Sequence, residues 1–257
     1  MRKFNENKLP TLAKIMYNSQ QKWVQENWKA TLAAHANGIN ALLDSIGVFD
    51  VWKKVLSNKY GKISKELIPE IFMDSYMSAH FACMGLYKQA NVCLRSQLET
   101  SLRLVYFSTH PVEYKWWCEG STWYLGSKFK DVWGPSYQYF EMLEEVKCFH
   151  KSCNLGLFKS IPDFYKTLSQ YVHGSAQSFL TKPNRISPKY NIGEYKKWET
   201  NFKDVQKYSN TIFVLGFAEV FRAEDVPVQR AILKIIKDKG YKNGLRKSLK
   251  LRISGRI

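Results

Sequence analysis

Apolar residues recur at intervals of three and four along most of the chain, which is the spacing of one face of an α-helix. Period-two alternation is nowhere sustained. The two Asn-Gly pairs, Asn37-Gly38 and Asn243-Gly244, have no β-rich runs beside them and so predict no hairpin. The pattern predicts an all-α fold.

The predicted helices are separated by breaks at glycine, proline and polar runs. The first runs from Thr11 to about Ser45 and directs to the core Ile15, Trp23, Leu32, Ile39 and Leu42/Leu43. The others cover 48–56, 65–87, 89–109, short pieces of 111–146, a helix that starts after Ser160-Ile161-Pro162 and ends at His173, 194–221 and 226–240. The tail 241–257 is basic and amphipathic at best.

Three regions are expected from this order of elements. Residues 1–64 form an N-terminal helical extension, residues 65–225 form the helical core, and residues 226–257 form a C-terminal helix and a basic tail. The chain of 257 residues is long enough for one elaborated domain or two small ones.

Charge narrows the class of partners. The formal net charge is +17, which favours polyanions: nucleic acid, an anionic membrane face or an acidic protein. From Lys237 to Ile257 there are eight Lys/Arg and one Asp. This run is either a solvated tail or a contact surface for nucleic acid or an acidic partner.

Cysteine usage and hydropathy bear on the compartment. The five cysteines are an odd number, which favours free thiols in a reducing environment. The N-terminus has no apolar signal region, and no run of 18 apolar residues occurs. We therefore expect a cytoplasmic protein that does not enter a membrane.

His173 is the first candidate for chemistry. On a helical projection of 163–174, Phe164 and Leu168 lie on the core side, whereas Lys166 and Ser169 lie on the polar side with His173. A small and nearly neutral polar face suits a cleft or an interface. The alternative is a structural histidine that caps the helix end.

A ladder of charges is the second candidate. Arg95, Glu99 and Arg103 recur at i, i+4 and i+8 beside an apolar stripe of Leu94, Leu98, Leu102 and Val105. We expect Glu99 to pair with Arg103 and to hold Arg95 from the other side. Such a ladder either fixes two helices together or keeps an arginine rigid for a phosphate.

The segments "GLYKQANVCLRSQLETSLRLVYFSTHP" and "FYKTLSQYVHGS" resemble the HEPN superfamily of helical domains, and within it the abortive-infection-type and uncharacterised bacterial members. The resemblance covers about residues 65–225. The matching positions are Gly85, Arg95, Ser96, Glu99, Tyr165, Ser169, His173 and Gly174.

The resemblance implies a HEPN-like helical bundle with additional N- and C-terminal helices, a homodimer, and metal-independent cleavage of RNA. In active members a histidine exchanges protons and an arginine stabilises the phosphorane. Here Lys166 occupies the place of that arginine, so Arg95 or Lys166 would contact the phosphate. Tyr165 and Ser169 would support His173, and Glu99 would hold Arg95.

The other groups of residues are weaker candidates for a functional site. Cys148, His150 and Cys153, with Cys118 nearby, have loose spacing for zinc and lack a second knuckle, so we expect no metal and no cofactor. Four tryptophans offer either core packing or a base-stacking platform: Trp116, Trp117, Trp123 and Trp133. The expected nucleic-acid contacts are Lys182, Arg185, Lys189, Arg246, Lys247, Lys250 and Arg252.

The function expected on this basis is an RNA-cleaving effector of a bacterial anti-phage defence or toxin system. RNA, a second copy of the chain and an operon-encoded partner or antitoxin protein are the expected partners. Two alternatives remain open. The chain is instead a non-catalytic helical module that binds nucleic acid or a partner protein, or a structural subunit whose basic tail docks on an acidic or nucleic-acid scaffold.

Overall fold

The computed structural model describes residues 11–120, 133–153, 157–173 and 189–251, and in these ranges every regular element is a helix. The all-α prediction is therefore confirmed. The helices are α1 (Thr11–Ile46), α2 (Val48–Cys83), α3 (Tyr87–Phe107), α4 (Pro111–Cys118), α5 (Trp133–Met142), α6 (Glu144–Cys153), α7 (Leu157–His173), α8 (Ile192–Gly216), α9 (Ala218–Ala223), α10 (Val226–Ile235) and α11 (Lys239–Ser248).

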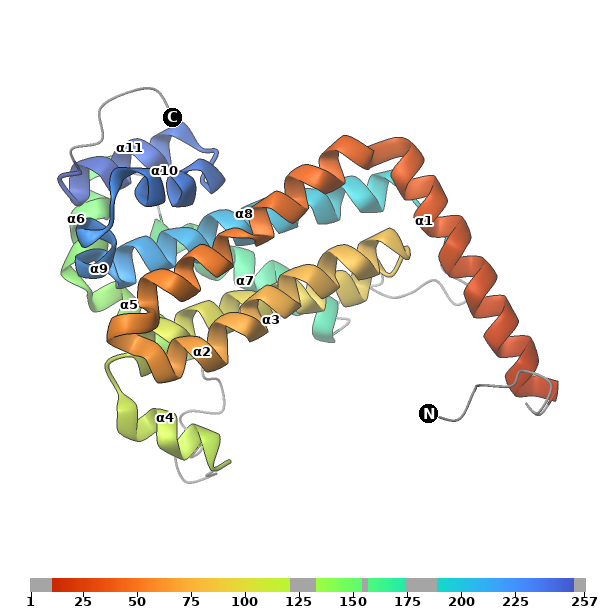
Figure 1. The fold of residues 1–257 in the computed structure, drawn as a ribbon, viewed down its shortest axis with the longest axis horizontal. Helices are drawn as coiled ribbons and strands as arrows, with labels where there is room; N and C mark the ends of the chain where they lie inside the picture. The colour runs from red at the N-terminus through yellow and green to blue at the C-terminus, as the bar shows by residue number, and fades with distance from the viewer. Residues whose placement is uncertain (1–10, 121–132, 154–156, 174–188, 252–257) are drawn as a thin grey trace.

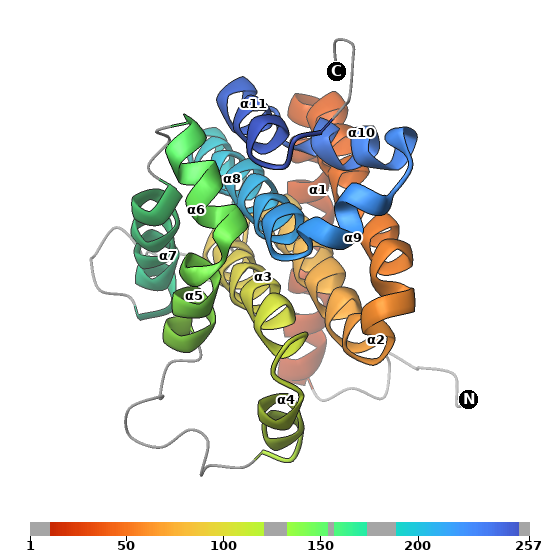
Figure 2. The ribbon, with the colours of Figure 1, turned by 90° about the vertical axis from the view of Figure 1, so that its left-hand side faces the viewer.

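Helix α3 lies at the centre of the bundle, with α2 on one side, α5 and α7 on the other, and α8 alongside it (Figure 1; Figure 2). Its predicted stripe is confirmed, because Leu94, Leu98 and Leu102 have no exposed surface and Val105 almost none. Burial of such side chains contributes about 2 kcal/mol each. Helix α3 is thus the element on which the candidate site depends.

Buried hydrogen bonds hold α8 against its neighbours. The Trp52 Nε1 of α2 donates to Asn210 Oδ1 at 2.9 Å, and the Trp198 Nε1 of α8 donates to Ser78 Oγ at 2.9 Å. A buried indole needs such an acceptor, because an unpaired N–H loses its hydrogen bond to water. These pairs fix the register of α8 against α2.

Helix α2 differs from the prediction. Two helices were expected over 48–56 and 65–87, but α2 is continuous from Val48 to Cys83, with a kink at Tyr60, whose φ of −126° and ψ of 32° are not helical. The expected region boundary between residues 64 and 65 lies inside this helix. The predicted break near Gly85 is confirmed, since Gly85 has a φ of +75°, which glycine adopts readily.

Helix α1 has the predicted length, but its packing was predicted only in part. Ile39 and Leu42 are buried, whereas Ile15, Leu32 and Leu43 are exposed, so their assignment to the core was wrong. The helix kinks at His35, and its N-terminal half leaves the bundle (Figure 1). Ile15, near the start of α1, therefore has no core to enter, whereas Leu32 and Leu43 lie on the outer side of the helix beside the buried Thr31 and Leu42.

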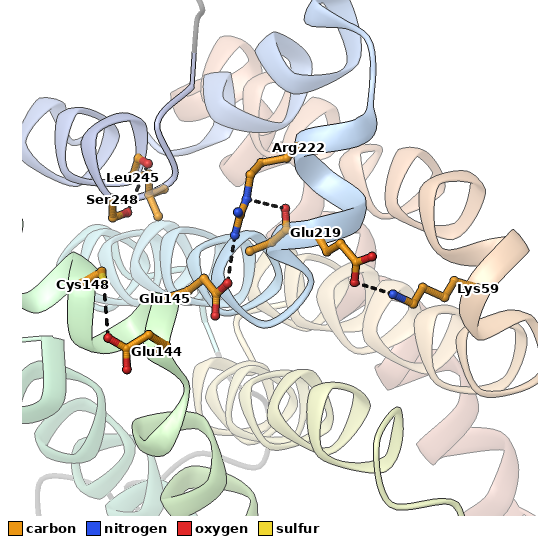
Figure 3. Close-up of polar contacts among 9 residues, drawn as sticks. Lys59, Glu144, Glu145, Cys148, Glu219, Arg222, Leu245 and Ser248 are labelled. Carbon is orange, nitrogen blue, oxygen red and sulfur yellow. Dashed lines mark hydrogen bonds and ion pairs between the residues drawn. The ribbon is translucent and has the colours of Figure 1, made fainter.

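The last third of the chain contains two further differences. The helix expected over 194–221 is divided between α8 and α9, and α7 begins at Leu157, before Pro162. Ion pairs join α9 to α2 through Lys59 and Glu219 at 2.6 Å, and to α6 through Arg222 and Glu145 at 2.8 Å (Figure 3).

The first part of the expected basic tail is also folded. Residues 239–248 form α11, which packs on α6 and α8, with Tyr241, Leu245 and Leu249 buried against them. A solvated tail over this stretch is therefore wrong. None of the described helices is long and apolar enough to cross a membrane.

Candidate functional site

The structure brings together three of the predicted site residues. Arg95 Nη2 donates to the Tyr165 hydroxyl at 2.7 Å, and that hydroxyl donates to Glu99 Oε1 at 2.7 Å. Arg95 Nη2 also lies 3.0 Å from Glu99 Oε1, and its guanidinium carbon lies 5.0 Å from the centre of the Tyr165 ring. The three groups form a closed triangle between α3 and α7.

Arg103 extends this triangle by one turn of α3. Its Nη2 lies 3.4 Å from Glu99 Oε2, so each carboxylate oxygen of Glu99 has a guanidinium partner. The predicted ladder is confirmed. Only 15–21% of the surface of each of these three charged side chains is exposed. Solvent therefore screens their attraction less than it does at an open surface.

The Tyr165 hydroxyl keeps its proton in this setting. Burial and the hydrogen bond to Glu99 raise the pKa of Tyr165 to about 12, although Arg95 acts in the opposite direction. Tyr165 is therefore a donor to Glu99 throughout the physiological range. It links α7 to the charged side chains of α3.

Asp74 of α2 lies at the edge of the same cluster and was missed from the sequence. The pKa of Asp74 is raised to about 6, chiefly by burial and also by the carboxylates of Glu70 and Glu99, while a hydrogen bond with Ser96 and the charge of Arg103 lower it. The sequence hints at its burial only through its place three residues after Ile71 and next to Ser75, which are both buried. We call Asp74, Arg95, Ser96, Glu99, Arg103 and Tyr165 the α3 polar cluster.

Two predicted residues of α7 lie apart from the α3 polar cluster. Lys166 has 77% of its side chain exposed and lies 3.9 Å from Asp163. Ser169 donates to the backbone oxygen of Tyr165 at 2.8 Å, within the helix itself. In this chain, Lys166 therefore does not face the groups that hold Arg95.

His173 is the last residue of α7, and its side chain lies outside the part of the structure that is described. It follows Tyr165 by eight positions, which corresponds to about 12 Å along the helix axis. The level of α7 that meets Arg95 is therefore about two turns from His173.

The predicted nucleic-acid contacts are distributed over different surfaces. Lys189, Lys247 and Lys250 are exposed, and Arg246 is half-buried on α11. The other three, Lys182, Arg185 and Arg252, lie outside the described residues, as do Gly174 and Trp123.

Other predicted alternatives can be placed in part. Among the described residues there is no group of three His, Cys, Asp or Glu side chains arranged to hold a metal ion. Cys148 Sγ lies 3.7 Å from Glu144 Oε1 (Figure 3). Trp117 packs with Phe107 and Tyr114 at 5.5 and 6.1 Å between ring centres, which is core packing and not an open stacking platform.

The geometry thus consists of a rigid, half-buried polar cluster on α3, a protonated tyrosine that links it to α7, and a helix that ends at His173. Such a cluster can orient an arginine or brace two helices. Comparison of the chain with models of protein families, with curated proteins and with solved structures finds no match.

Proposed function

We propose that the protein is a HEPN-like, metal-independent endoribonuclease that acts as an effector of a bacterial anti-phage defence or toxin system. One observation supports this most. Arg95 and Glu99 come from one resembling segment and Tyr165 from the other, 66–70 positions apart, and the three interlock by hydrogen bonds. The pairing is what a shared site on these two segments requires.

The proposed chemistry is transfer of a backbone phosphoryl group from the 5′-oxygen of one nucleotide to the 2′-oxygen of the nucleotide before it. His173 removes the proton of the 2′-hydroxyl, the 2′-oxygen bonds to phosphorus, and the bond from phosphorus to the 5′-oxygen breaks. The proton passes to the leaving 5′-oxygen. The products are a 2′,3′-cyclic phosphate and a 5′-hydroxyl, with no metal ion in the reaction.

The other residues have supporting roles in this proposal. Tyr165, Ser169 and His173 succeed one another at intervals of four along α7, so they follow one side of the helix. Arg95 is held in place by Glu99 and Tyr165 and supplies positive charge, while the exposed Lys166 is the second candidate for a phosphate contact.

A homodimer belongs to the proposal, because Arg95 and His173 are separated along one chain and a second copy offers another pair. The exposed Leu12, Ile15 and Met16 on the projecting half of α1 provide apolar surface for such a contact. The net charge of +17 favours RNA as the substrate.

The test is cleavage of end-labelled single-stranded RNA by the full chain in the presence of a chelator. We expect His173→Ala to reduce cleavage at least a hundredfold, because general acid–base catalysis contributes about 10²–10⁴ in rate. His150→Ala on α6 is the matched control and should cleave like the wild type. Cyclic phosphate ends on the products would support the mechanism; equal cleavage by His173→Ala would contradict it.

The second candidate is a non-catalytic module that binds RNA or a partner protein. The contacts of Arg95 favour this candidate as well, since its guanidinium is already bound by Glu99 and by Tyr165. An arginine held in this way braces α3 against α7. Tight RNA binding without cleavage, unchanged in His173→Ala, would support this candidate.

A further inference from the structure

One side of α2 is only partly covered by the rest of the bundle. Positions 66, 70, 73, 77 and 80 alternate by four and three residues, so they follow one line along the helix. Met73 is 52% exposed, Tyr76 beside it is 46% exposed, and Met77 is half-buried. The name α2 outer face is used below for Glu66, Glu70, Met73, Tyr76, Met77 and His80.

The projecting half of α1 has a line of side chains with the same spacing. Leu12, Met16, Ser19 and Trp23 also alternate by four and three residues, and Leu12 and Met16 are exposed. Residues 11–26, which we call the α1 arm, leave the bundle (Figure 1). A helix of this length is marginal in water unless its apolar side packs on another surface. The α1 arm therefore needs a surface to pack on.

Within one chain, α1 already packs on one end of the α2 outer face. The ring of Trp28 lies 5.6 Å from that of His80, and His80 stacks on Tyr76 with 6.4 Å between ring centres. Before Trp28 the helix turns away from α2, so Met73 and Tyr76 stay exposed (Figure 1). Among the described helices, α1 and α2 are the only two with more than one exposed large hydrophobic residue. The uncovered part of α2 thus continues an existing contact between α1 and α2.

Charge also matches these two surfaces. Residues 66–80 of α2 contain three acids, Glu66, Glu70 and Asp74, and no Lys or Arg, which is unusual in a chain with a net charge of +17. Residues 11–30 of α1 contain three lysines and one glutamate. A basic amphipathic helix and an acidic, methionine-containing face are complementary.

We propose that the α1 arm of a second copy of this chain packs along the α2 outer face, and that the two copies exchange their arms reciprocally. This rests on the homodimer of the proposed function and names the surface that receives the arm. Reciprocal exchange gives two identical contacts in each dimer, as a twofold axis requires. The spacing of four and three on both helices lets their side chains interdigitate as in a coiled coil.

The first experiment places a photo-reactive benzoylphenylalanine at position 73 of the full chain. Irradiation should give a covalent dimer that survives denaturing electrophoresis, and mass spectrometry should find the attached peptide within residues 11–26. The matched control carries the same group in place of Val112, which is 54% exposed on α4, at the end of the molecule opposite the arm (Figure 1). The control should form no covalent dimer.

The second experiment measures the dissociation constant of the dimer by light scattering over a range of dilutions. We expect Met73→Glu to raise it about a hundredfold, because each dimer would bury two carboxylates against apolar side chains. Val112→Glu makes the same kind of change at a similarly exposed position and should leave the constant unchanged.

Three results would overturn the proposal. One is a wild type of single mass, and another is a dimer whose dissociation constant is the same in Met73→Glu. The third is a covalent link from position 73 to residues outside 11–26, or from benzoylphenylalanine at position 16 to the other arm, which would mean that the two arms pair with each other. None of these readouts uses RNA cleavage, so failure of the proposed catalysis leaves them unaffected.

Discussion

The Tyr165 hydroxyl joins the charges of α3 to α7, and its removal tests how much it contributes. Tyr165→Phe keeps the buried ring and leaves Arg95 paired with Glu99. Because hydrogen bonds to charged groups are lost, we expect the free energy of unfolding to fall by about 1–3 kcal/mol in urea denaturation.

Tyr195→Phe is the matched control for that measurement. Tyr195 is fully buried, and its hydroxyl has no hydrogen-bond partner in the described residues. Removing a buried hydroxyl without a partner should leave stability unchanged or raise it. If both variants lose the same stability, the bonds of Tyr165 are not what holds α7.

Asp74 makes stability depend on pH in an unusual direction. Burial raises the pKa of Asp74 from 3.8 to about 6, so the folded state binds the proton more tightly than the unfolded state. The stabilisation is fully present below pH 4 and is lost as pH rises to about 6. Asp74→Asn keeps a polar group beside Ser96 and removes the titration.

We therefore expect Asp74→Asn to raise the free energy of unfolding at pH 7 by about 1–2 kcal/mol, measured by urea denaturation. The gain should be smaller at pH 4. The groups that face Asp74 are Glu70 on its own helix and Cys93, Ser96, Glu99 and Arg103 on α3. Parallel stability curves for the two proteins between pH 4 and 7 would show that Asp74 is not the group responsible.

At the scale of elements, α8 approaches α3 closely at Gly216. A Cβ atom at this position would lie 2.6 Å from both methyl groups of Val105. We expect Gly216→Ala to lower the free energy of unfolding by about 1–3 kcal/mol, as overpacking of a core does. Thermal denaturation with Val105→Ala added should recover part of the loss.

Gly61→Ala provides the comparison within α2. No atom lies within 4 Å of a Cβ at position 61, so the added methyl group meets no neighbour. Alanine favours a helix over glycine by about 1 kcal/mol, and this variant should be more stable than the wild type. A loss at Gly61 as large as that at Gly216 would mean that the close approach to Val105 is not the cause.

Periodicity predicted the elements well where each helix has one buried stripe. It placed α1 within one residue of its ends and identified the Leu94, Leu98 and Leu102 face of α3. Local spacing also predicted both pairs of Glu99, because i and i+4 side chains meet on any helix. These features need no knowledge of tertiary structure.

Features that depend on distant segments were predicted less well. The hydrogen bond between Tyr165 and Arg95 was not predicted, since it requires α7 to pack on α3. Asp74 was missed because three of the groups that act on it, Ser96, Glu99 and Arg103, lie on α3 and not on its own helix. The fold of α11 was missed because a short, glycine-containing basic segment becomes helical through packing on α6 and α8.

At the scale of the whole molecule, the proposed homodimer predicts a change in mass. Leu12, Ile15 and Met16 lie on one side of the projecting half of α1 and are 59–76% exposed. We expect light scattering to give about twice 30.0 kDa for the wild type and the single mass for Ile15→Glu/Met16→Glu. Asn18→Glu/Gln25→Glu adds the same charge to exposed polar positions on the other side of the helix and should leave the dimer intact. A wild type of single mass would contradict the prediction.

The central position of α3 also has a consequence for synthesis. Helix α8, which covers part of its apolar stripe, begins at Ile192, long after α3 ends at Phe107. At about 5–20 residues per second, the ribosome needs roughly 4–17 s to make the intervening chain. During that interval the leucines of α3 lack one of their native neighbours, and the nascent protein depends on chaperones or on the speed of translation to avoid aggregation.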